Sequence, residues 1–251
     1  MPAPYPHIAL MPQRADLVLV ERGLFESRAK AQEAIAAGRV RADGRVLRKP
    51  SEPIGADAEI EATAPYPWVS RGGVKLEAAL VAFGFDVAGA TCLDAGASTG
   101  GFTDVLLTRG AVKVYAVDVG HGQLHPRLAA DPRVVSSEGR DVRTLLPSDF
   151  SEPPSFLTCD VSFISLSLVL PAILAVASPR ARLVALIKPQ FEVGPAHVVK
   201  GIVQDAALHR DACIKIERLL REAGWQIAGL VDSPIRGGDG NREYLIGASK
   251  L

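Results

Sequence analysis

The chain has 251 residues, of which 48% are hydrophobic and 22% are charged, and its 28 basic residues balance its 28 acidic ones. This length and composition fit a globular protein with one large and one small domain. They exclude a membrane-spanning protein, because no apolar run reaches the roughly 18–20 residues that a bilayer requires.

Residues 1–13 contain no basic stretch followed by an apolar one, so they predict no secretory signal, and we expect a cytoplasmic protein. Cys92, Cys159 and Cys213 lie far apart in apolar segments, which indicates buried, reduced thiols and no metal site. Because the net charge is zero, any binding of nucleic acid has to come from a local basic patch.

Residues 14–61 predict a small α+β domain. A first helix follows Asp16, and a second is capped by Ser27 and stopped by Gly38. An Asp-Gly turn at 43–44 then predicts a tight hairpin. The inner face of the second helix is expected to comprise Ala31, Ala34 and Ile35.

The same segment is basic. Between Arg14 and Pro50 there are nine Lys and Arg against five Asp and Glu, a local net charge of +4. A solvated surface would account for this excess by itself, but SRAKA in the second helix and GRVRADGRVL after it resemble the small S-four RNA-binding fold, named after a ribosomal protein. The resemblance implies a basic face for structured RNA, on which phosphate contacts supply affinity. The candidates for this face are Arg14, Arg28, Arg41 and Lys49.

Residues 62–70, ATAPYPWVS, hold two prolines and no charge, and they predict a linker with Trp68 packed at the domain junction. Residues 71–251 alternate helix and strand, which predicts an open parallel sheet with helices on both faces. The last two strands are joined by a Gly-rich loop and predict a closing antiparallel hairpin. Strands are expected at 91–96, 112–118, 133–137, 155–160, 182–188, 226–232 and 243–249, and helices at 72–84, 99–109, 166–177 and 205–224.

The strongest motif is LDAGASTGGFTDVLL at 93–107, where a strand ends, a turn of small residues follows and a helix begins. Such a turn lets backbone N–H groups approach a ligand. The G-x-G-x-x-G pattern of nicotinamide enzymes is absent, and no Lys-Ser/Thr pair indicates phosphate binding. The spacing Asp94-x-Gly96-x-x-x-Gly100 resembles instead the first motif of S-adenosylmethionine methyltransferases. This resemblance implies that the methionine end of the cofactor is held by Asp94, Gly96, Ser98, Thr99, Gly100 and Gly101.

Acidic residues follow the next strands. Asp118 lies 24 residues beyond Asp94, where a carboxylate can accept hydrogen bonds from both ribose hydroxyls. Asp141 follows the third strand and is expected near the adenine. Each acid alone would fit a helix cap, but their series at successive strand ends favours binding. With the antiparallel last strand, the pattern predicts the Rossmann-like sheet of a class I methyltransferase. The expected cofactor is S-adenosylmethionine, and the expected product is S-adenosylhomocysteine.

Methyl transfer to a ribose 2′-hydroxyl requires a base and a positive charge that stabilises the developing oxyanion. A lysine can be that base only if its pKa is depressed. The candidates are Lys75, on the helix at 72–84, and three residues at strand termini, where open parallel sheets place their ligands: Asp160, Lys188 and Glu243. Taken singly, each also fits an exposed strand end or a solvated helix lysine.

The order Lys-Asp-Lys-Glu resembles the FtsJ-like ribose 2′-O-methyltransferases. The phrases SRGGVKL, DVSFISL, KPQFEVG and GNREYL resemble the TlyA family, which joins an S-four domain to an FtsJ-like domain and methylates cytidine 2′-hydroxyls in ribosomal RNA. The resemblance implies that Lys188 is the base, helped by Lys75. It also implies that Asp160 and Glu243 orient the lysines, with Asp160 near the transferable methyl.

The resemblance further implies a partner and a reaction course. The partner is ribosomal RNA within ribosomal subunits, and no membrane is involved. The attack is a direct in-line displacement, which needs no covalent enzyme intermediate and no metal. Arg71, four residues before Lys75, is a candidate for holding a phosphate near the target nucleotide. We expect a monomer.

Three alternatives stay open. An RNA base methyltransferase is the nearest, because DVSF at 160–163 is similar to the D-P-P-F/Y motif that holds an exocyclic amine, although both prolines are missing. Cys159 could serve carbon-5 methylation, although it lies inside an apolar strand.

A membrane-active hemolysin-type protein is the second alternative, because the TlyA family was named for haemolytic activity. No long basic amphipathic helix with aromatic anchors is evident in the sequence. An RNA-binding protein without catalysis is the third.

Overall fold

The computed structural model describes residues 11–251. The absence of a secretory signal, predicted from residues 1–13, therefore falls largely outside the described residues. The chain divides into two compact units, Met1–Pro67 and Trp68–Leu251. Their boundary lies inside the segment 62–70, whose limits as a linker stay a prediction.

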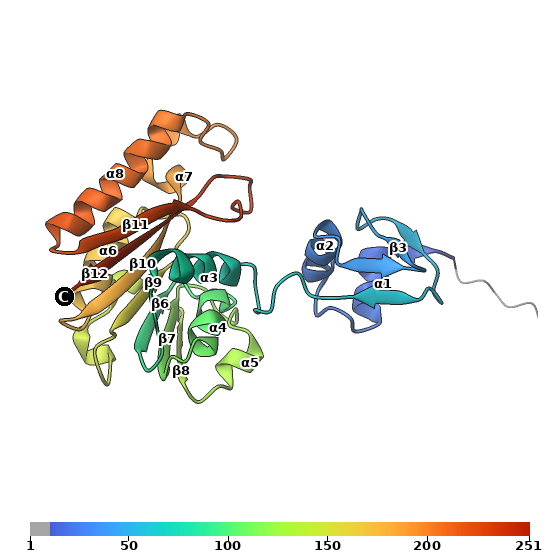
Figure 1. Cartoon of the computed structure of the whole chain (residues 1–251), viewed down its shortest axis with the longest axis horizontal. Helices are drawn as coiled ribbons and strands as arrows, with labels where there is room; N and C mark the ends of the chain where they lie inside the picture. Colours follow the sequence, from blue (N-terminus) through green and yellow to red (C-terminus); the bar gives the residue numbers. More distant parts are fainter. Residues whose placement is uncertain (1–10) are drawn as a thin grey trace, which may run out of the picture. The chain divides into compact units, whose positions relative to one another are not determined.

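The N-terminal unit packs two helices against short antiparallel strands (Figure 1). Ser27 caps the second helix by accepting a hydrogen bond from the Lys30 backbone N–H (3.3 Å). Asp43 and Gly44 have φ of 49° and 74°, as a type I′ hairpin turn requires. The predicted inner face of the second helix is buried. The elements are β1 (Gln13–Arg14), α1 (Ala15–Glu21), α2 (Arg28–Ala36), β2 (Val40–Ala42), β3 (Arg45–Val46), β4 (Pro53–Ile54) and β5 (Ile60–Ala62).

The C-terminal unit is built on a seven-stranded sheet in the order β11-β12-β10-β9-β6-β7-β8 (Figure 1). Within this sheet β12 runs antiparallel to both of its neighbours, while β10, β9, β6, β7 and β8 are mutually parallel. The predicted fold, a Rossmann-like sheet with an antiparallel last strand, is confirmed. The strands are β6 (Thr91–Ala95), β7 (Lys113–Asp118), β8 (Val134–Glu138), β9 (Phe156–Cys159), β10 (Ala181–Ile187), β11 (Gln226–Asp232) and β12 (Tyr244–Lys250).

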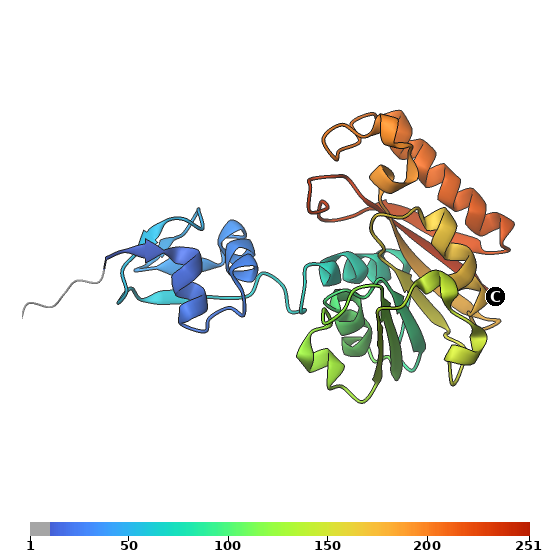
Figure 2. The ribbon, with the colours of Figure 1, turned by 180° about the vertical axis from the view of Figure 1, so that it is seen from behind.

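Helices cover both faces of this sheet, as Figures 1 and 2 show from opposite sides. Alternation along β10 explains the two layers. Leu183 and Ala185 pack toward α6 and α8, whereas Val184 and Leu186 pack toward α3 and α4. Trp68 packs on Gly73 at the start of α3, where an added Cβ would lie 2.6 Å from the Trp68 ring. The helices are α3 (Gly72–Phe83), α4 (Gly101–Thr108), α5 (Pro126–Ala129), α6 (Leu166–Ala175), α7 (Pro189–Glu192) and α8 (Ala206–Glu222).

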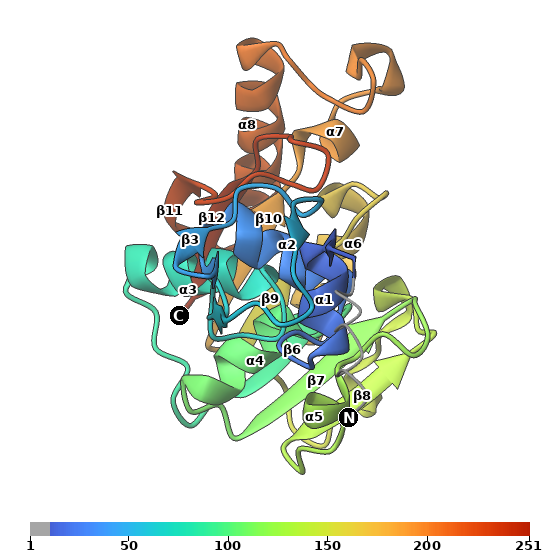
Figure 3. The ribbon, with the colours of Figure 1, turned by 90° about the vertical axis from the view of Figure 1, so that its right-hand side faces the viewer.

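The loop between β11 and β12 lies beside the segment that precedes α8 (Figures 1 and 3). Asn241, which is 1% exposed, joins the two. Its side-chain nitrogen donates to the Gly201 carbonyl (2.7 Å), and its side-chain oxygen accepts from the Val203 N–H (3.2 Å). These two bonds anchor the chain two residues before Glu243, where the loop enters β12.

Candidate active site

Two ion pairs bring together the four polar residues that the sequence predicts for catalysis. Lys75 Nζ lies 2.6 Å from Glu243 Oε2, and Lys188 Nζ lies 2.6 Å from Asp160 Oδ1. The two lysines are buried, with exposed fractions of 6% and 8%. Two lysines, each steered by one carboxylate, are therefore present at one place in the fold.

Strand pairing explains why these residues meet. Ile187 pairs with the first residue of β12, so Lys188 and Glu243 are the next residues outward on adjacent strands. Asp160 directly follows β9, which is the other neighbour of β10. Lys75 reaches the same edge from the first turn of α3. The carboxyl ends of parallel strands share one edge, so residues far apart in the chain converge there.

Ser162 also belongs to this site, although the sequence analysis did not single it out. Its Oγ accepts a hydrogen bond from Lys188 Nζ (2.8 Å). Asp160 Oδ1 contacts the same ammonium group, but no donor in residues 11–251 is aligned with this buried oxygen for a hydrogen bond. Charge attraction to Asp160 and the hydrogen bond to Ser162 therefore hold the Lys188 ammonium group in place.

A cavity of about 560 Å³ borders Asp160 at the same edge of the sheet. Its volume is typical of small-molecule sites, which span roughly 300–1,000 Å³. Part of the predicted cofactor set lines the cavity, namely Gly96, Ser98, Asp118, Asp141 and Asp160. The remaining predicted residues lie outside its lining, namely Asp94, Thr99, Gly100 and Gly101.

Asp118 fixes the backbone around this cavity. Its Oδ2 accepts a hydrogen bond from the Ser98 N–H (2.8 Å), and its Oδ1 accepts one from the Gly120 N–H (2.7 Å). Ser98 has a φ of 46°, a left-handed conformation that residues with a side chain seldom adopt, and the bond to Asp118 stabilises it. Each carboxylate oxygen can accept a second hydrogen bond, so Asp118 can still bind two ribose hydroxyls.

The glycines of the turn are required by packing inside the domain. Gly96 and Gly100 have φ of 84° and 94°. A Cβ at Gly96 would lie 2.5 Å from the Asp160 backbone oxygen, and one at Gly100 would lie 2.3 Å from a methyl group of Leu128. Both backbone N–H groups already bond to carbonyls of the same unit (2.8 Å and 2.7 Å). Gly96 lines the cavity, whereas Gly100, just ahead of α4, leaves room for the Leu128 side chain of α5.

Asp94 lies behind the turn and is fully buried. Its carboxylate accepts hydrogen bonds from the hydroxyls of Thr103 on α4 (2.7 Å) and Thr158 on β9 (2.9 Å). Burial raises the pKa of Asp94 to about 6. The residue ties the helix after the turn to the neighbouring strand, and its predicted contact with a cofactor stays a prediction.

Asp141 and Arg143 form one wall of the cavity. Asp141 caps the short 3₁₀ helix Val142–Thr144 by accepting the Arg143 N–H (2.9 Å). The Arg143 guanidinium, whose Nε lies 3.0 Å from Asp141 Oδ1, holds the pKa of that carboxyl below its ordinary value. Asp141 is therefore a charged, oriented acceptor at this wall, and its predicted contact with adenine stays a prediction.

Phe163 is a second residue of the site that the sequence analysis missed. It lines the same cavity and is 92% exposed, although it is a large apolar ring. Its φ is 65°, and its ring centroid lies 5.3 Å from that of Phe191. An exposed aromatic held in an uncommon backbone conformation beside the predicted catalytic residues is a candidate for stacking on a substrate ring. The phrase DVSF contains it, but no periodicity in the sequence shows its exposure.

Basic side chains surround Glu243. Arg71 Nη2 lies 3.2 Å from the position that a Cβ of Gly238 would take, so the guanidinium rests on the Gly-rich loop. A second cavity, of about 210 Å³, is lined by Glu243 together with Arg236 and Arg242. Asp232 lines the same cavity and pairs with Arg242 (3.0 Å), so the basic and acidic side chains there are balanced.

In the N-terminal unit, two of the four predicted RNA contacts lie together. Arg14 and Arg28 each contact the buried carboxylate of Asp16 at 3.0 Å. Arg41 donates instead to a carbonyl of the hairpin turn (2.8 Å), and Lys49 is exposed. All four stay predictions as RNA contacts.

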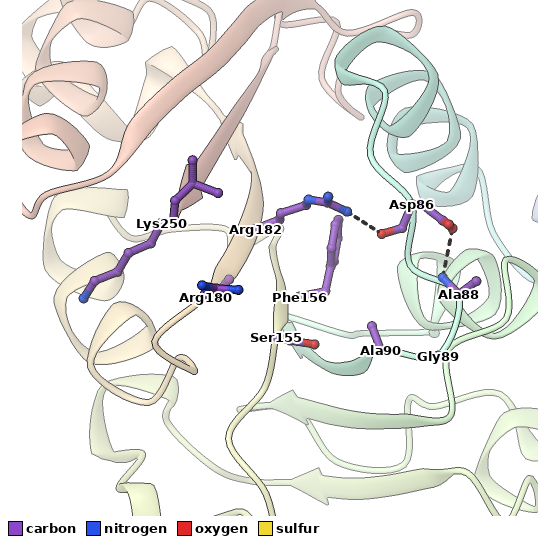
Figure 4. Close-up of a pocket in the computed structure, with 11 residues that line it drawn as sticks. Asp86, Ala88, Gly89, Ala90, Ser155, Phe156, Arg180, Arg182 and Lys250 are labelled. Atoms are coloured by element: carbon purple, nitrogen blue, oxygen red, sulfur yellow. Dashed lines mark hydrogen bonds between the residues drawn. The ribbon is translucent and has the colours of Figure 1, made fainter.

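A further hollow, of about 380 Å³, lies at the opposite edge of the sheet (Figure 4). Arg182 donates to the Asp86 carbonyl (3.0 Å). Phe156 also lines the hollow, and the Lys250 side chain points away from it. Arg180 completes the basic rim. No residue predicted for catalysis or cofactor binding lines this hollow, so the carboxyl edge remains the candidate active site.

Two structural features bear on the alternatives. Within residues 11–251 no helix is long and apolar enough to cross a membrane. In that same range no group of three or more His, Cys, Asp or Glu is placed to hold a metal ion. The predicted state of the cysteines is confirmed, because Cys92, Cys159 and Cys213 are free and buried.

Comparison with known families matches the two units separately. Residues 68–250 match the FtsJ-like methyltransferase model, and residues 13–60 match the S4 domain. The chain belongs to the FtsJ-like methyltransferase family. The protein is therefore an enzyme that transfers methyl groups, and its FtsJ-like domain contains both ion pairs and the cavity.

Individual relatives of this methyltransferase span nearly its whole length. It is 46% identical over 236 residues to the 16S/23S rRNA (cytidine-2′-O)-methyltransferase TlyA of Mycobacterium tuberculosis, which covers 93% of this chain and 88% of the relative. It is 42% identical to Hemolysin A of Brachyspira hyodysenteriae, covering 92% of this chain and 98% of the relative. A solved structure of a hemolysin candidate from Streptococcus thermophilus superimposes with a TM-score of 0.76 at 42% identity, covering 96% and 90% of the two chains. The predicted membership of the TlyA, or hemolysin A, family is confirmed.

Proposed function

We propose that this methyltransferase transfers the methyl group of S-adenosylmethionine to the ribose 2′-hydroxyl of a cytidine in ribosomal RNA. The observation that carries the proposal is the pair of buried ion pairs, Lys75–Glu243 and Lys188–Asp160, beside a cavity at the carboxyl edge of the sheet. The name of the Mycobacterium tuberculosis relative supports the substrate. We propose further that the enzyme acts as a monomer in the cytoplasm, on ribosomal subunits.

The cavity fits S-adenosylmethionine in size and in chemistry. Asp118 would accept hydrogen bonds from the ribose hydroxyls, Asp141 would approach the adenine, and Asp160 would lie nearest the reacting methyl. Three carboxylates around one cavity also suit a cationic ligand. When bound, this cofactor supplies a methyl group activated by a positively charged sulfur.

The lysines supply the proton transfer. After release of its own proton, Lys188 Nζ would take the proton of the 2′-hydroxyl as the ribose oxygen accepts the methyl group. S-adenosylmethionine would supply that methyl group and leave as S-adenosylhomocysteine. Lys75, paired with Glu243, supplies positive charge toward the developing oxyanion. Asp160 and Ser162 hold Lys188 in place.

RNA would be held by both units. The basic face of the N-terminal unit would contact phosphates through Arg14, Arg28, Arg41 and Lys49, and Arg71 would hold a phosphate near the target. A ribose inside a helix is hard to reach, so the target nucleotide would leave its stack. The exposed ring of Phe163 would then stack on the extruded base.

The alternative chemistry of base methylation has less support. Cys159, the candidate nucleophile for carbon-5 methylation, is fully buried, and burial raises the pKa of its thiol. A protonated thiol without access to substrate cannot attack a base. The two lysine–carboxylate pairs, in contrast, have a direct use in deprotonating a hydroxyl.

The test is transfer of tritiated methyl from S-adenosylmethionine to unmodified ribosomal RNA and to ribosomal subunits. We expect stable incorporation into RNA, and primer extension at low nucleotide concentration should pause at the labelled position. Digestion to nucleosides should then yield 2′-O-methylcytidine.

Label recovered on a base would contradict the ribose chemistry while leaving the methyltransferase fold intact. No label on any ribosomal RNA, although S-adenosylmethionine binds normally, would contradict the substrate. A parallel assay measures leakage of dye from lipid vesicles. Leakage caused by the protein would support the membrane-active alternative.

A further inference from the structure

Asp16 in the N-terminal unit has no role in the activity described above, yet it is the most heavily bonded carboxylate of that unit. It lies in the first turn of α1 and is 0% exposed. Its Oδ1 accepts Arg14 Nε (3.0 Å), and its Oδ2 accepts Arg14 Nη2 (3.0 Å). The same Oδ2 accepts Arg28 Nη2 (3.0 Å) and Gln32 Nε2 (2.7 Å).

These contacts compensate the buried charge. A carboxylate out of water is costly unless it is paired and hydrogen-bonded. The hydrogen bonds from Arg14, together with those from Gln32 and Arg28, hold the pKa of Asp16 well below its usual range. The residue is therefore ionised at neutral pH and keeps both arginines in one geometry.

The two guanidinium groups remain available on their outer sides. The Arg14 and Arg28 side chains are 46% and 53% exposed. Each guanidinium donates to Asp16 through Nε and one terminal nitrogen, so three of its five N–H donors have no partner on Asp16 and none among the hydrogen bonds of residues 11–251. Fixed, half-exposed guanidinium groups can bind phosphate oxygens bidentately with little further loss of side-chain entropy.

Other arginines of the unit are used differently. Arg22 donates to the Ala58 carbonyl (2.6 Å) and ties the end of α1 to a loop. Arg45 lies 3.4 Å from Glu52 on the surface. Neither shares a buried acid with a second arginine, so the grouping of Arg14, Asp16 and Arg28 is a built feature of this face.

We propose that Asp16 is a positioning residue that presents Arg14 and Arg28 as one preorganised pair to backbone phosphates of structured RNA. The inference rests on the proposed binding of RNA by the N-terminal unit. The proposal predicts a change in RNA affinity opposite in direction to the one that net charge alone predicts. Removing a negative charge from an RNA-binding face should tighten binding. If Asp16 positions the arginines, its removal should weaken binding instead.

The experiment measures the affinity of the full-length protein for an unmodified 23S ribosomal RNA transcript at fixed salt. We expect Asp16→Asn to weaken binding by about three- to tenfold, and the pair Arg14→Gln with Arg28→Gln to weaken it by about 10- to 100-fold. Asp57→Asn is the matched control, because it removes an exposed acid of the same unit. The control should bind as tightly as the native protein or tighter.

A double-mutant cycle separates positioning from a loss of structure. In the background that lacks both arginines, Asp16→Asn should cause no further loss of affinity, because the residue acts through them. Thermal unfolding of each variant reports whether the unit stays folded. If Asp16→Asn does not fold, Arg14→Lys with Arg28→Lys replaces it. This variant keeps the charge but loses the bidentate geometry, and it should also bind more weakly.

The outcomes are distinct. Native or tighter affinity of a folded Asp16→Asn variant, or equal losses with and without the arginines, would overturn the role of Asp16. Native affinity of the doubly lysine-substituted variant would overturn it as well. Native affinity of the variant lacking both arginines would overturn the RNA face itself, which is part of the proposed function.

Discussion

At the scale of single residues, the buried charges of the larger domain fall into two kinds. Lys75 with Glu243 and Lys188 with Asp160 are paired, so removing one partner leaves the other uncompensated. Asp94 is different, because hydroxyl groups and no cation contact its carboxylate in the described residues. Its ionisation therefore opposes folding.

Asp94→Asn tests this conclusion through pH. Because burial raises the pKa of Asp94 in the folded state to about 6, the folded protein binds its proton more tightly than the unfolded chain. The free energy of unfolding should then fall as pH rises from about 4 to about 6, by roughly 2 kcal/mol. The variant lacks this group, so its stability relative to the native protein should rise by that amount across the same interval.

Urea unfolding followed by tryptophan fluorescence measures this difference, because Trp68 and Trp225 both lie in the unit Trp68–Leu251. Asp211→Asn, which changes an exposed acid on α8, serves as the control and should not alter the pH dependence. A constant difference in unfolding free energy between Asp94→Asn and the native protein at pH 4 and pH 7 would contradict the account.

At the scale of elements, the loop between β7 and α5 forms part of the cavity wall through Gly120 and Gln123. Glu138, at the end of β8, holds this loop from outside. Its carboxylate accepts the backbone N–H groups of three consecutive loop residues at 2.8, 2.7 and 2.9 Å. These bonds, led by that of Leu124, keep the pKa of Glu138 below its ordinary value.

Glu138→Gln should therefore weaken cofactor binding. The amide group cannot accept N–H bonds at its nitrogen, so the loop loses part of its support and the cavity wall loosens. We expect the Kd for S-adenosylmethionine to rise on the order of tenfold, with a smaller effect on kcat. Isothermal titration calorimetry measures it, with the exposed Glu152→Gln as control. Unchanged affinity in Glu138→Gln would show that the loop needs no such support.

At the scale of the whole molecule, the net charge of zero results from an uneven distribution of charge along the chain. The segment from Arg14 to Pro50 carries a net charge of +4, which suits RNA phosphates. The cavity of the larger unit is bordered by Asp118, Asp141 and Asp160, which suit a cationic cofactor. A basic segment and a cavity with three aspartates on its lining therefore lie in different units.

Much of this organisation follows from local sequence rules. Ser27 caps a helix and the Asp-Gly turn at 43–44 makes a hairpin, because each depends only on a few neighbouring residues. The proximity of Lys188 and Glu243 could be predicted from the sequence, because the ends of neighbouring strands in such a sheet share an edge. The two lysine–carboxylate contacts are consequences of that topology.

Other features depend on contacts that no local rule contains. Gly100 is needed because Leu128 packs against it, and the burial of Asp94 depends on threonines from two separate elements. The exposure of Phe163 and the shared use of Asp16 by two arginines likewise arise from tertiary packing. Five of the nine residues predicted to hold the cofactor line the cavity, but motif spacing did not distinguish them from the four that do not line it.

The most direct measurement of the central claim is single-turnover methylation of ribosomal RNA by Lys188→Met, beside Lys250→Met at the opposite edge of the sheet (Figure 4). If Lys188 is the base, its variant should lose at least about 100-fold in rate while binding S-adenosylmethionine normally, and Lys250→Met should keep the native rate. A native rate for Lys188→Met would contradict the assignment of the base and, with it, the proposed use of the two ion pairs.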